Sequence, residues 1–190
     1  MNLEGVLSFT RTVMQRVVRP GGFVVDATVG NGHDTLFLAQ LIGDTGRVFG
    51  YDIQEEAIAN TKKQLQEREL LERVTLFQTG HENISATIPE EIHGSLSGAM
   101  FNLGYLPGGN KSIVTKAETT IMAVKQLLKM MAPGGIIVLV VYHGHKEGEK
   151  ERNELLKFSQ NLDQDMVHVL QYAFINLKNN APFVLAFEKR

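Results

Sequence analysis

Hydrophobic residues follow two patterns along this chain: short apolar runs, and longer segments in which they recur every three or four positions. The runs are typical of buried strands, and the longer segments of amphipathic helices. The expected strands are a run that ends at Asp26 and the ranges 47–52, 74–78, 97–102, 136–142, 167–177 and 183–188. The expected helices span 3–18, 34–42, 55–68, 113–131 and 147–161, with a weaker one at 84–92 that Pro89 interrupts.

The order of these elements predicts the fold. Helices separate the first five strands, which is typical of parallel pairing, whereas only residues 178–182 separate the last two strands, so these should form a hairpin. We therefore expect an α/β protein with a doubly wound, mostly parallel seven-stranded sheet and a C-terminal antiparallel β-hairpin. No repeat or linker interrupts the chain, and we expect a single domain over residues 1–190.

Composition narrows the function. The chain has no cysteine, which excludes disulfides, thiolate metal sites and a cysteine nucleophile. We expect no metal site, because only His143 and His145 have close ligand spacing and two ligands are too few. We also expect no membrane span and no export signal, hence a cytoplasmic protein. A net charge of −2 means that any nucleic acid must bind a local basic patch, for which the candidates are Arg11, Arg16, Arg19, Lys146, Lys150, Arg152 and Lys157.

A glycine loop follows the first strand. The strand ends in Asp26, Gly30 and Gly32 lie in the loop, and a helix is expected to open at Asp34. Asp52 lies twenty residues past Gly32 at the end of the second strand, where a carboxylate can bind ribose hydroxyls. This arrangement is typical of proteins that hold an adenosine-containing ligand.

A nicotinamide dehydrogenase is one alternative for this loop. Its fingerprint would need a third glycine where Thr35 stands, and Asp34 would repel a pyrophosphate at the helix N-terminus. A cationic sulfonium ligand suits Asp26 and Asp34 better. Asp34 could also act as the N-cap of the helix, with or without a ligand contact.

The chain resembles the class I S-adenosylmethionine-dependent methyltransferases, which have a Rossmann-like fold. Residues 26–32 match their acid-x-Gly-x-Gly-x-Gly motif, with Thr28 at the first glycine. Together with this loop, the stretches YHGH at 142–145 and NNAPF at 179–183 resemble a narrower family that covers nearly the whole chain. Those small proteins are labelled rRNA methylases and are now associated with methylating the 5-aminomethyl group of 2-thiouridine at the tRNA wobble position 34. The resemblance implies S-adenosyl-L-methionine as cofactor and the tRNA anticodon loop as substrate.

The expected donor site gathers residues at the ends of the first four strands. They are Asp26, Thr28, Gly30, Asn31, Gly32, His33, Asp34, Asp52, Ile53, His81, Glu82 and Asn102. The family usually has an adenine-binding acid after the third strand. Here His81 stands in that place with Glu82 next to it, and the sequence leaves open which of them contacts adenine.

Residues 102–105, Asn-Leu-Gly-Tyr, are similar to the Asn/Asp-Pro-Pro-Tyr motif of amino-group methyltransferases. Methylating C5 of a pyrimidine usually needs a thiolate, so a chain without cysteine should act on nitrogen or oxygen. An alkylamine must lose a proton before attack, which a base or a desolvating pocket could arrange. The candidate catalytic residues are Asn102, Tyr105, Tyr142, His143 and His145. The candidate substrate-binding residues are Leu103, Gly104, Pro107, Asn179, Asn180 and Phe183.

Alternatives remain open at this point. The chain could methylate rRNA or a small metabolite, or it could be a non-catalytic module that binds the donor and regulates a partner. The intact 102–105 motif and the paired histidines disfavour a module. The sequence also leaves open whether the chain acts as a homodimer.

Overall fold

The computed structural model describes residues 2–105, 114–144 and 146–190. Within these residues, seven strands form one sheet in the order β3-β2-β1-β4-β5-β7-β6. The strands are β1 (Phe23–Asp26), β2 (Arg47–Tyr51), β3 (Val74–Phe77), β4 (Leu96–Asn102), β5 (Met131–Val141), β6 (Val167–Tyr172) and β7 (Phe183–Lys189). The α-helices are α1 (Val6–Val17), α2 (His33–Leu41), α3 (Glu55–Glu67), α4 (Ile84–Thr87), α5 (Ala117–Met130) and α6 (Lys146–Gln160).

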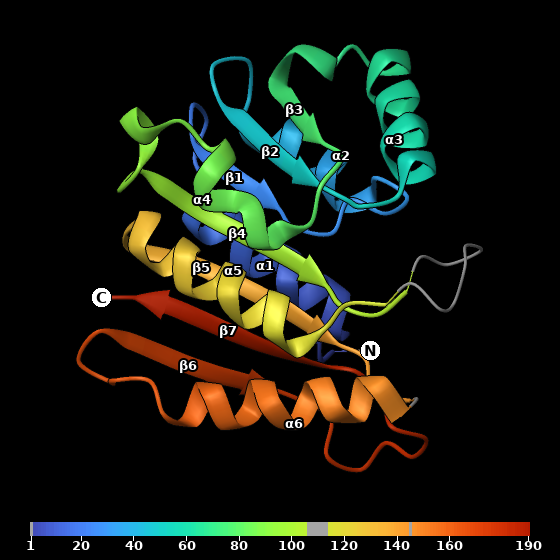
Figure 1. Ribbon diagram of the computed structural model, residues 1–190, viewed down its shortest axis with the longest axis vertical. Coiled ribbons are helices and arrows are strands. Elements are labelled where there is room, and N and C mark those ends of the chain that lie inside the picture. The colour runs from blue at the N-terminus through green and yellow to red at the C-terminus, as the bar shows by residue number, and fades with distance from the viewer. Residues whose placement is uncertain (1, 106–113, 145) are drawn as a thin grey trace.

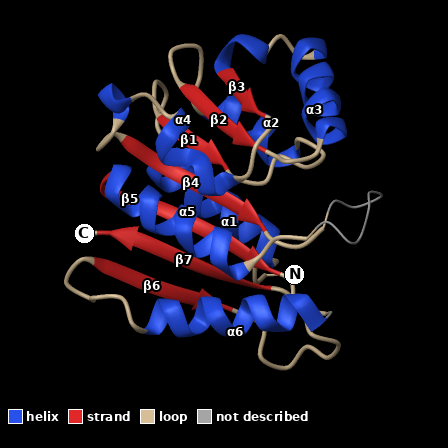
Figure 2. Cartoon of the chain, viewed as in Figure 1, coloured by secondary structure: helices blue, strands red, loops and turns tan. Residues whose placement is uncertain are grey.

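The sheet topology confirms the expected fold. β1 to β5 pair in parallel, while β7 runs antiparallel to both β5 and β6. Helices cover both faces of the sheet, with α5 and α6 in front and α1 behind it (Figure 1; Figure 2 separates helices from strands by colour).

Alternating strand side chains build two cores, one on each face. Val25 packs into the core that includes Leu127 of α5 and Leu155 of α6. Its neighbour Val24 packs into the opposite core, with Met14 of α1 and Leu38 of α2. The continuous apolar runs of the sequence are therefore explained by strands that are buried on both faces.

Several expected boundaries were wrong. The helix expected at 113–131 begins only at Ala117, because Val114 instead forms a β-bridge with Tyr105. β5 begins at Met131 rather than at 136. β6 ends at Tyr172 rather than at 177, since pairing with β7 stops there and Ile175 is 99% exposed. The segment 84–92 divides at Pro89, as expected, into α4 and a 3₁₀ turn (Glu90–Ile92).

Candidate active site

A cavity of about 1150 Å³ lies at the carboxyl ends of the parallel strands. Most of the expected site residues line it: Thr28, Gly30, Asn31, His33, Asp34, Asp52, Ile53, His81, Glu82, Asn102, Leu103, Gly104, Tyr105, Tyr142, His143 and Asn180. Four expected residues do not line it, namely Asp26, Gly32, Asn179 and Phe183. Pro107 and His145 lie outside the described residues. The parallel sheet thus brings segments that are distant in sequence to one edge.

The backbone of the glycine loop is held from β2 and α3. The Gly30 N–H donates to Asp52 Oδ2 at 2.9 Å, and the Gln54 N–H donates to Asp52 Oδ1 at 2.9 Å. From α3, Thr61 Oγ1 donates to the Gly30 carbonyl at 3.3 Å and Gln64 Nε2 to the Asn31 carbonyl at 2.9 Å. Thr61 and Gln64 could not be predicted as loop contacts, because a pair of polar residues on one helix face usually faces solvent.

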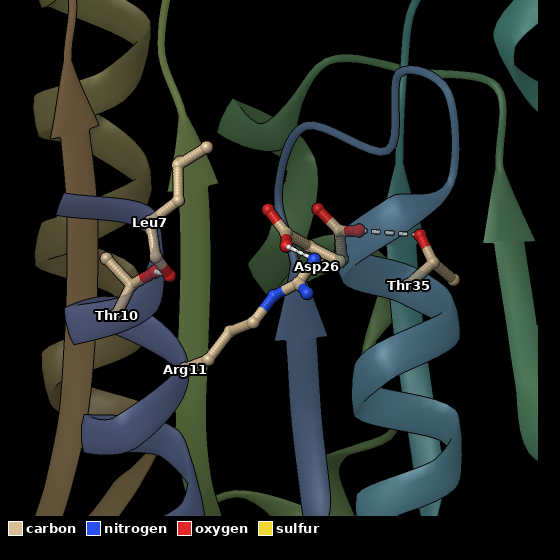
Figure 3. Close-up of polar contacts among 6 residues, drawn as sticks. Leu7, Thr10, Arg11, Asp26 and Thr35 are labelled. Atoms are coloured by element: carbon tan, nitrogen blue, oxygen red, sulfur yellow. Dashed lines mark hydrogen bonds and ion pairs between the residues drawn. The ribbon is translucent and has the colours of Figure 1, made fainter. Parts of the chain in front are cut away.

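Gly32 has a structural role that only glycine can fill. It adopts φ +78°, and a Cβ there would lie 2.7 Å from Thr61 Oγ1. Gly32 is also the N-cap of α2, so Asp34 is not the cap but lies within the first helical turn. Asp34 instead forms an ion pair with Arg11 of α1 at 3.3 Å (Figure 3).

Asp26 lies beneath the cavity rather than in its wall. It is 1% exposed, and its carboxylate accepts a hydrogen bond from Thr35 Oγ1 at 2.6 Å (Figure 3). It also accepts one from the Thr28 N–H at 3.1 Å. Burial, reinforced by the negative charge of Asp34, raises the pKa of Asp26 to about 7. The acid of the strand-one motif therefore anchors the loop from below.

Thr28 explains the departure from the glycine motif. Its Oγ1 accepts a hydrogen bond from the Asn102 N–H at 2.7 Å, which joins the loop after β1 to the end of β4. A glycine at this position could not make that contact. The two expected halves of the site, for the donor and for the acceptor, are thus linked directly.

His81 and Glu82 occupy different environments. His81 is 7% exposed, and its Nδ1 lies 3.0 Å from the Ala27 carbonyl, which can only accept. Burial lowers the pKa of His81, so its ring is neutral, with the proton on Nδ1. Among the described residues its Nε2 has no hydrogen-bond partner. Glu82 is partly exposed and accepts at its backbone carbonyl from Gln126 Nε2 at 2.7 Å.

The 102–105 motif is hydrogen-bonded to Thr115, which lies just before α5. The Gly104 N–H donates to Thr115 Oγ1 at 2.9 Å, and the Thr115 N–H donates to the Gly104 carbonyl at 3.0 Å. Tyr105 and Val114 form an antiparallel bridge next to this pair. Thr115 and Lys116 also line the cavity, although the sequence placed them within a helix.

His143 is engaged through both ring nitrogens. Its Nε2 lies 3.0 Å from the Ala181 carbonyl oxygen, and its Nδ1 lies 3.4 Å from Arg152 Nη1. A carbonyl accepts and a guanidinium donates, so these contacts fit a neutral ring with its proton on Nε2. His143 thereby links the end of β5 to α6 and to the loop before β7. The neighbouring Tyr142 has a pKa that burial and the charge of Asp34 raise.

Comparison with known proteins identifies the family. A family profile described as "Putative rRNA methylase" matches residues 48–188. The chain belongs to this rRNA methylase family. A chloroplastic tRNA (mnm(5)s(2)U34)-methyltransferase of Arabidopsis thaliana is 39% identical over 158 residues, which are 79% of this chain and 57% of that protein. The chain thus spans little more than half the length of this curated relative.

Solved structures agree with the family assignment. A protein of the same description from Clostridium thermocellum is 42% identical, with a TM-score of 0.96 and 100% of both chains covered. A "putative methyltransferase" from Streptococcus mutans, solved in complex with SAH, is 32% identical, with a TM-score of 0.89 and 99% of both chains covered. This rRNA methylase family member therefore has the class I methyltransferase fold that its sequence predicts.

Two kinds of feature are absent from the residues that the structure describes. No group of three or more histidine, cysteine or acidic side chains in residues 2–105, 114–144 and 146–190 could hold a metal ion. Over the same residues, no helix is both long and apolar enough to cross a membrane.

Proposed function

We propose that this protein is an S-adenosylmethionine-dependent N-methyltransferase that acts on the 5-aminomethyl group of 2-thiouridine at the tRNA wobble position. The observation that carries the proposal is that one cavity joins the glycine loop and Asp52 to the Asn102–Tyr105 motif. At about 1150 Å³ it exceeds the usual range of pockets for one small ligand, which suits a donor and a nucleoside together. The S. mutans relative is solved with SAH, the product form of that donor.

The donor half suits a cation that carries a nucleoside. Asp34 and Asp52 line the cavity, and so does Gly30, which adopts φ +51° and has no side chain to occupy that space. In this proposal Asp52 binds the ribose hydroxyls, and the partly exposed Glu82 contacts adenine in preference to the buried His81. S-adenosylmethionine, when bound, supplies a methyl group that its sulfonium already activates.

The acceptor half can orient an amine. The side-chain oxygen of Asn102 can accept an N–H hydrogen bond, which would direct the nitrogen lone pair towards the donor. Tyr105 and Tyr142 offer aromatic faces against which a flat base can stack. These side chains would contribute to catalysis mainly by holding the amine close to the methyl group and aligned with it. The amine must arrive neutral, and desolvation in this pocket favours its neutral form.

The name of the A. thaliana relative supports the choice of tRNA. A wobble uridine lies in an unpaired loop, so presenting it costs less than extracting a paired base. The proposal includes a single functional domain over residues 1–190 and a cytoplasmic location. The alternatives that it must exclude are an rRNA or metabolite methyltransferase and a donor-binding module without activity.

Transfer of radiolabelled methyl to purified tRNA, rRNA and a small-molecule extract separates these functions. We expect label only in tRNA, and only when that tRNA bears 5-aminomethyl-2-thiouridine. An otherwise identical tRNA with unmodified uridine at the wobble position is the matched substrate control. Label in rRNA or in metabolites would show that the substrate is not tRNA. SAH binding without transfer to any of the three would indicate a binding module.

A further inference from the structure

Glu151 differs from the other acidic residues of α6. Glu147, Glu149 and Glu154 are exposed, as expected for a charged helix on the surface. Glu151 is only 4% exposed. Burying a carboxylate is costly unless hydrogen bonds compensate, so its position calls for specific partners.

The carboxylate of Glu151 accepts hydrogen bonds from two threonine hydroxyls. Thr115 Oγ1 donates to Oε2 at 2.7 Å, and Thr120 Oγ1 donates to Oε1 at 2.9 Å. The threonine hydroxyl is the donor in both contacts, so both hydroxyl protons point towards the carboxylate. The lone pairs of Thr115 Oγ1 are then directed away from Glu151, and one of them receives the Gly104 N–H.

Through Thr115, the hydrogen bonds of Glu151 extend to Gly104 of the 102–105 motif. Gly104 has φ +132°, a backbone conformation that favours glycine, and it lies between Leu103 and Tyr105 in the cavity wall. Its N–H and carbonyl both bind Thr115. The orientation of this peptide therefore depends on Thr115, whose hydroxyl is in turn oriented by Glu151.

We propose that Glu151 is a positioning residue for the methyl acceptor. It acts through Thr115 to fix the Gly104 backbone, and thereby the placement of Asn102 and Tyr105 against the incoming amine. The proposal rests on the proposed function for its effect on catalysis, but the structural contact can be tested without activity. Glu151 itself is not among the residues that line the cavity.

Two valine substitutions provide a matched test. Thr115→Val and Thr120→Val each remove one hydroxyl from Glu151 with little change in shape, but only Thr115 also holds Gly104. Exchange of the Gly104 amide, followed by NMR, should become about ten-fold faster in Thr115→Val and stay unchanged in Thr120→Val. Thr115→Ser should restore the wild-type rate. Exchange that is unchanged in Thr115→Val would overturn the proposal.

Kinetics then test whether the contact matters for methyl transfer. We expect Thr115→Val to lower kcat/KM for the acceptor by about ten-fold while its affinity for SAH stays within about two-fold. Glu151→Gln should give a smaller loss, because an amide can still accept from one threonine while presenting an N–H to the other. The surface variant Glu154→Gln and Thr120→Val should match wild type. Faster Gly104 exchange with unchanged acceptor kinetics would overturn the positioning role.

Failure of the proposed function would look different. In that case the wild-type protein transfers no methyl group to the modified tRNA, while the Gly104 exchange rates still follow Thr115. The contact would then be structural only, which would also overturn the positioning role.

Discussion

Asp52 uses both carboxylate oxygens to hold the backbone around the donor half of the cavity. One oxygen accepts from Gly30 and the other from Gln54. A carboxylate offers about four lone-pair positions, so roughly two remain for ribose hydroxyls. The same side chain can therefore shape the loop and bind the ligand.

Replacing Asp52 should weaken donor binding. Asp52→Ala removes the charge-assisted contacts to ribose and releases Gly30, so we expect SAH affinity to fall by roughly 1.5–3 kcal/mol, or about 10- to 150-fold. Isothermal titration calorimetry measures this directly. Asp165→Asn, at an exposed acid away from the cavity, should bind like wild type. A folded Asp52→Ala protein with wild-type affinity would remove Asp52 from the donor site.

Asp26 should make stability depend on pH. Its pKa is about 7 in the folded protein and 3.8 for an ordinary aspartate, so the folded state holds a proton that the unfolded chain releases between these values. The free energy of unfolding should therefore fall as pH rises from about 4 to about 7. Asp26→Asn keeps the shape without the charge and should lack this trend.

Chemical denaturation of the ligand-free protein tests the role of Asp26. Between about pH 5 and about pH 8, the stability of Asp26→Asn relative to wild type should rise by more than about 1 kcal/mol. Asp165→Asn serves again as the control and should show a constant difference. A constant difference for Asp26→Asn as well would mean that Asp26 is ionised in the folded protein throughout this range.

Most residues of the cavity wall can be predicted from the sequence, but the residues that hydrogen-bond to the wall from outside it cannot. Strand ends in a parallel sheet share an edge, so Asp52 and Asn102 could be placed together from the pattern alone. In the sequence Thr28 is visible only as a departure from a motif, and Glu151 is one of several glutamates in a charged helical segment. Their roles depend on side chains that meet across long stretches of chain, and no local spacing encodes such contacts.

At the scale of whole elements, α6 contacts two walls of the acceptor site through adjacent residues. Glu151 reaches the segment before α5, and Arg152 reaches His143. His143 in turn holds the Ala181 carbonyl, next to Asn180 in the cavity wall. Since both nitrogens of His143 are occupied, we expect it to position the loop before β7 rather than to accept the amine proton.

A pH profile of single-turnover methylation distinguishes these roles. His143→Ala and Arg152→Met should slow transfer by a similar factor at every pH, because each breaks the same link, while SAH affinity is retained. Lys63→Met removes a positive charge from an exposed position of α3 and should match wild type. A deficit in His143→Ala that shrinks as pH rises would instead identify His143 as the base.

The element boundaries show where the sequence pattern stops being informative. Order, type and pairing of the strands followed from periodicity and from connection lengths. The extra apolar residues beyond Tyr172 looked like a longer strand, but a strand continues only as far as its partner does. Val114 likewise fits a helical pattern in the sequence. In the structure it forms a β-bridge with Tyr105 instead, and the local sequence does not predict this contact.

For the whole molecule, positive and negative charges nearly balance, at a net charge of −2, and several cationic side chains contact other residues of the protein. Arg11 pairs with Asp34 and lies over the Phe37 ring, and Arg152 lies against His143. Lys150 and Lys157 remain exposed on α6. The contribution of positive charge to RNA binding should therefore come from a small patch that includes these two lysines of α6.

Binding to tRNA should depend on salt, but only moderately. Each phosphate that the protein neutralises releases counterions, so log affinity should fall linearly with log salt. For a patch of a few lysines we expect a slope of roughly −2 to −4. Fluorescence anisotropy with labelled tRNA over a salt series measures this slope, and Lys150→Met with Lys157→Met should flatten it. Affinity that does not change with salt would exclude phosphate contacts as the main source of binding.

The position of β7 affects how the protein is made. β7 lies between β5 and β6 although it follows both in the chain. While residues 183–189 are still inside the ribosome, one edge of β5 and the β6 segment lack the strand with which they pair. The parallel part of the sheet, which carries the glycine loop, can assemble earlier. The nascent protein thus passes through a late stage with unpaired apolar strand edges, when protection by chaperones matters most.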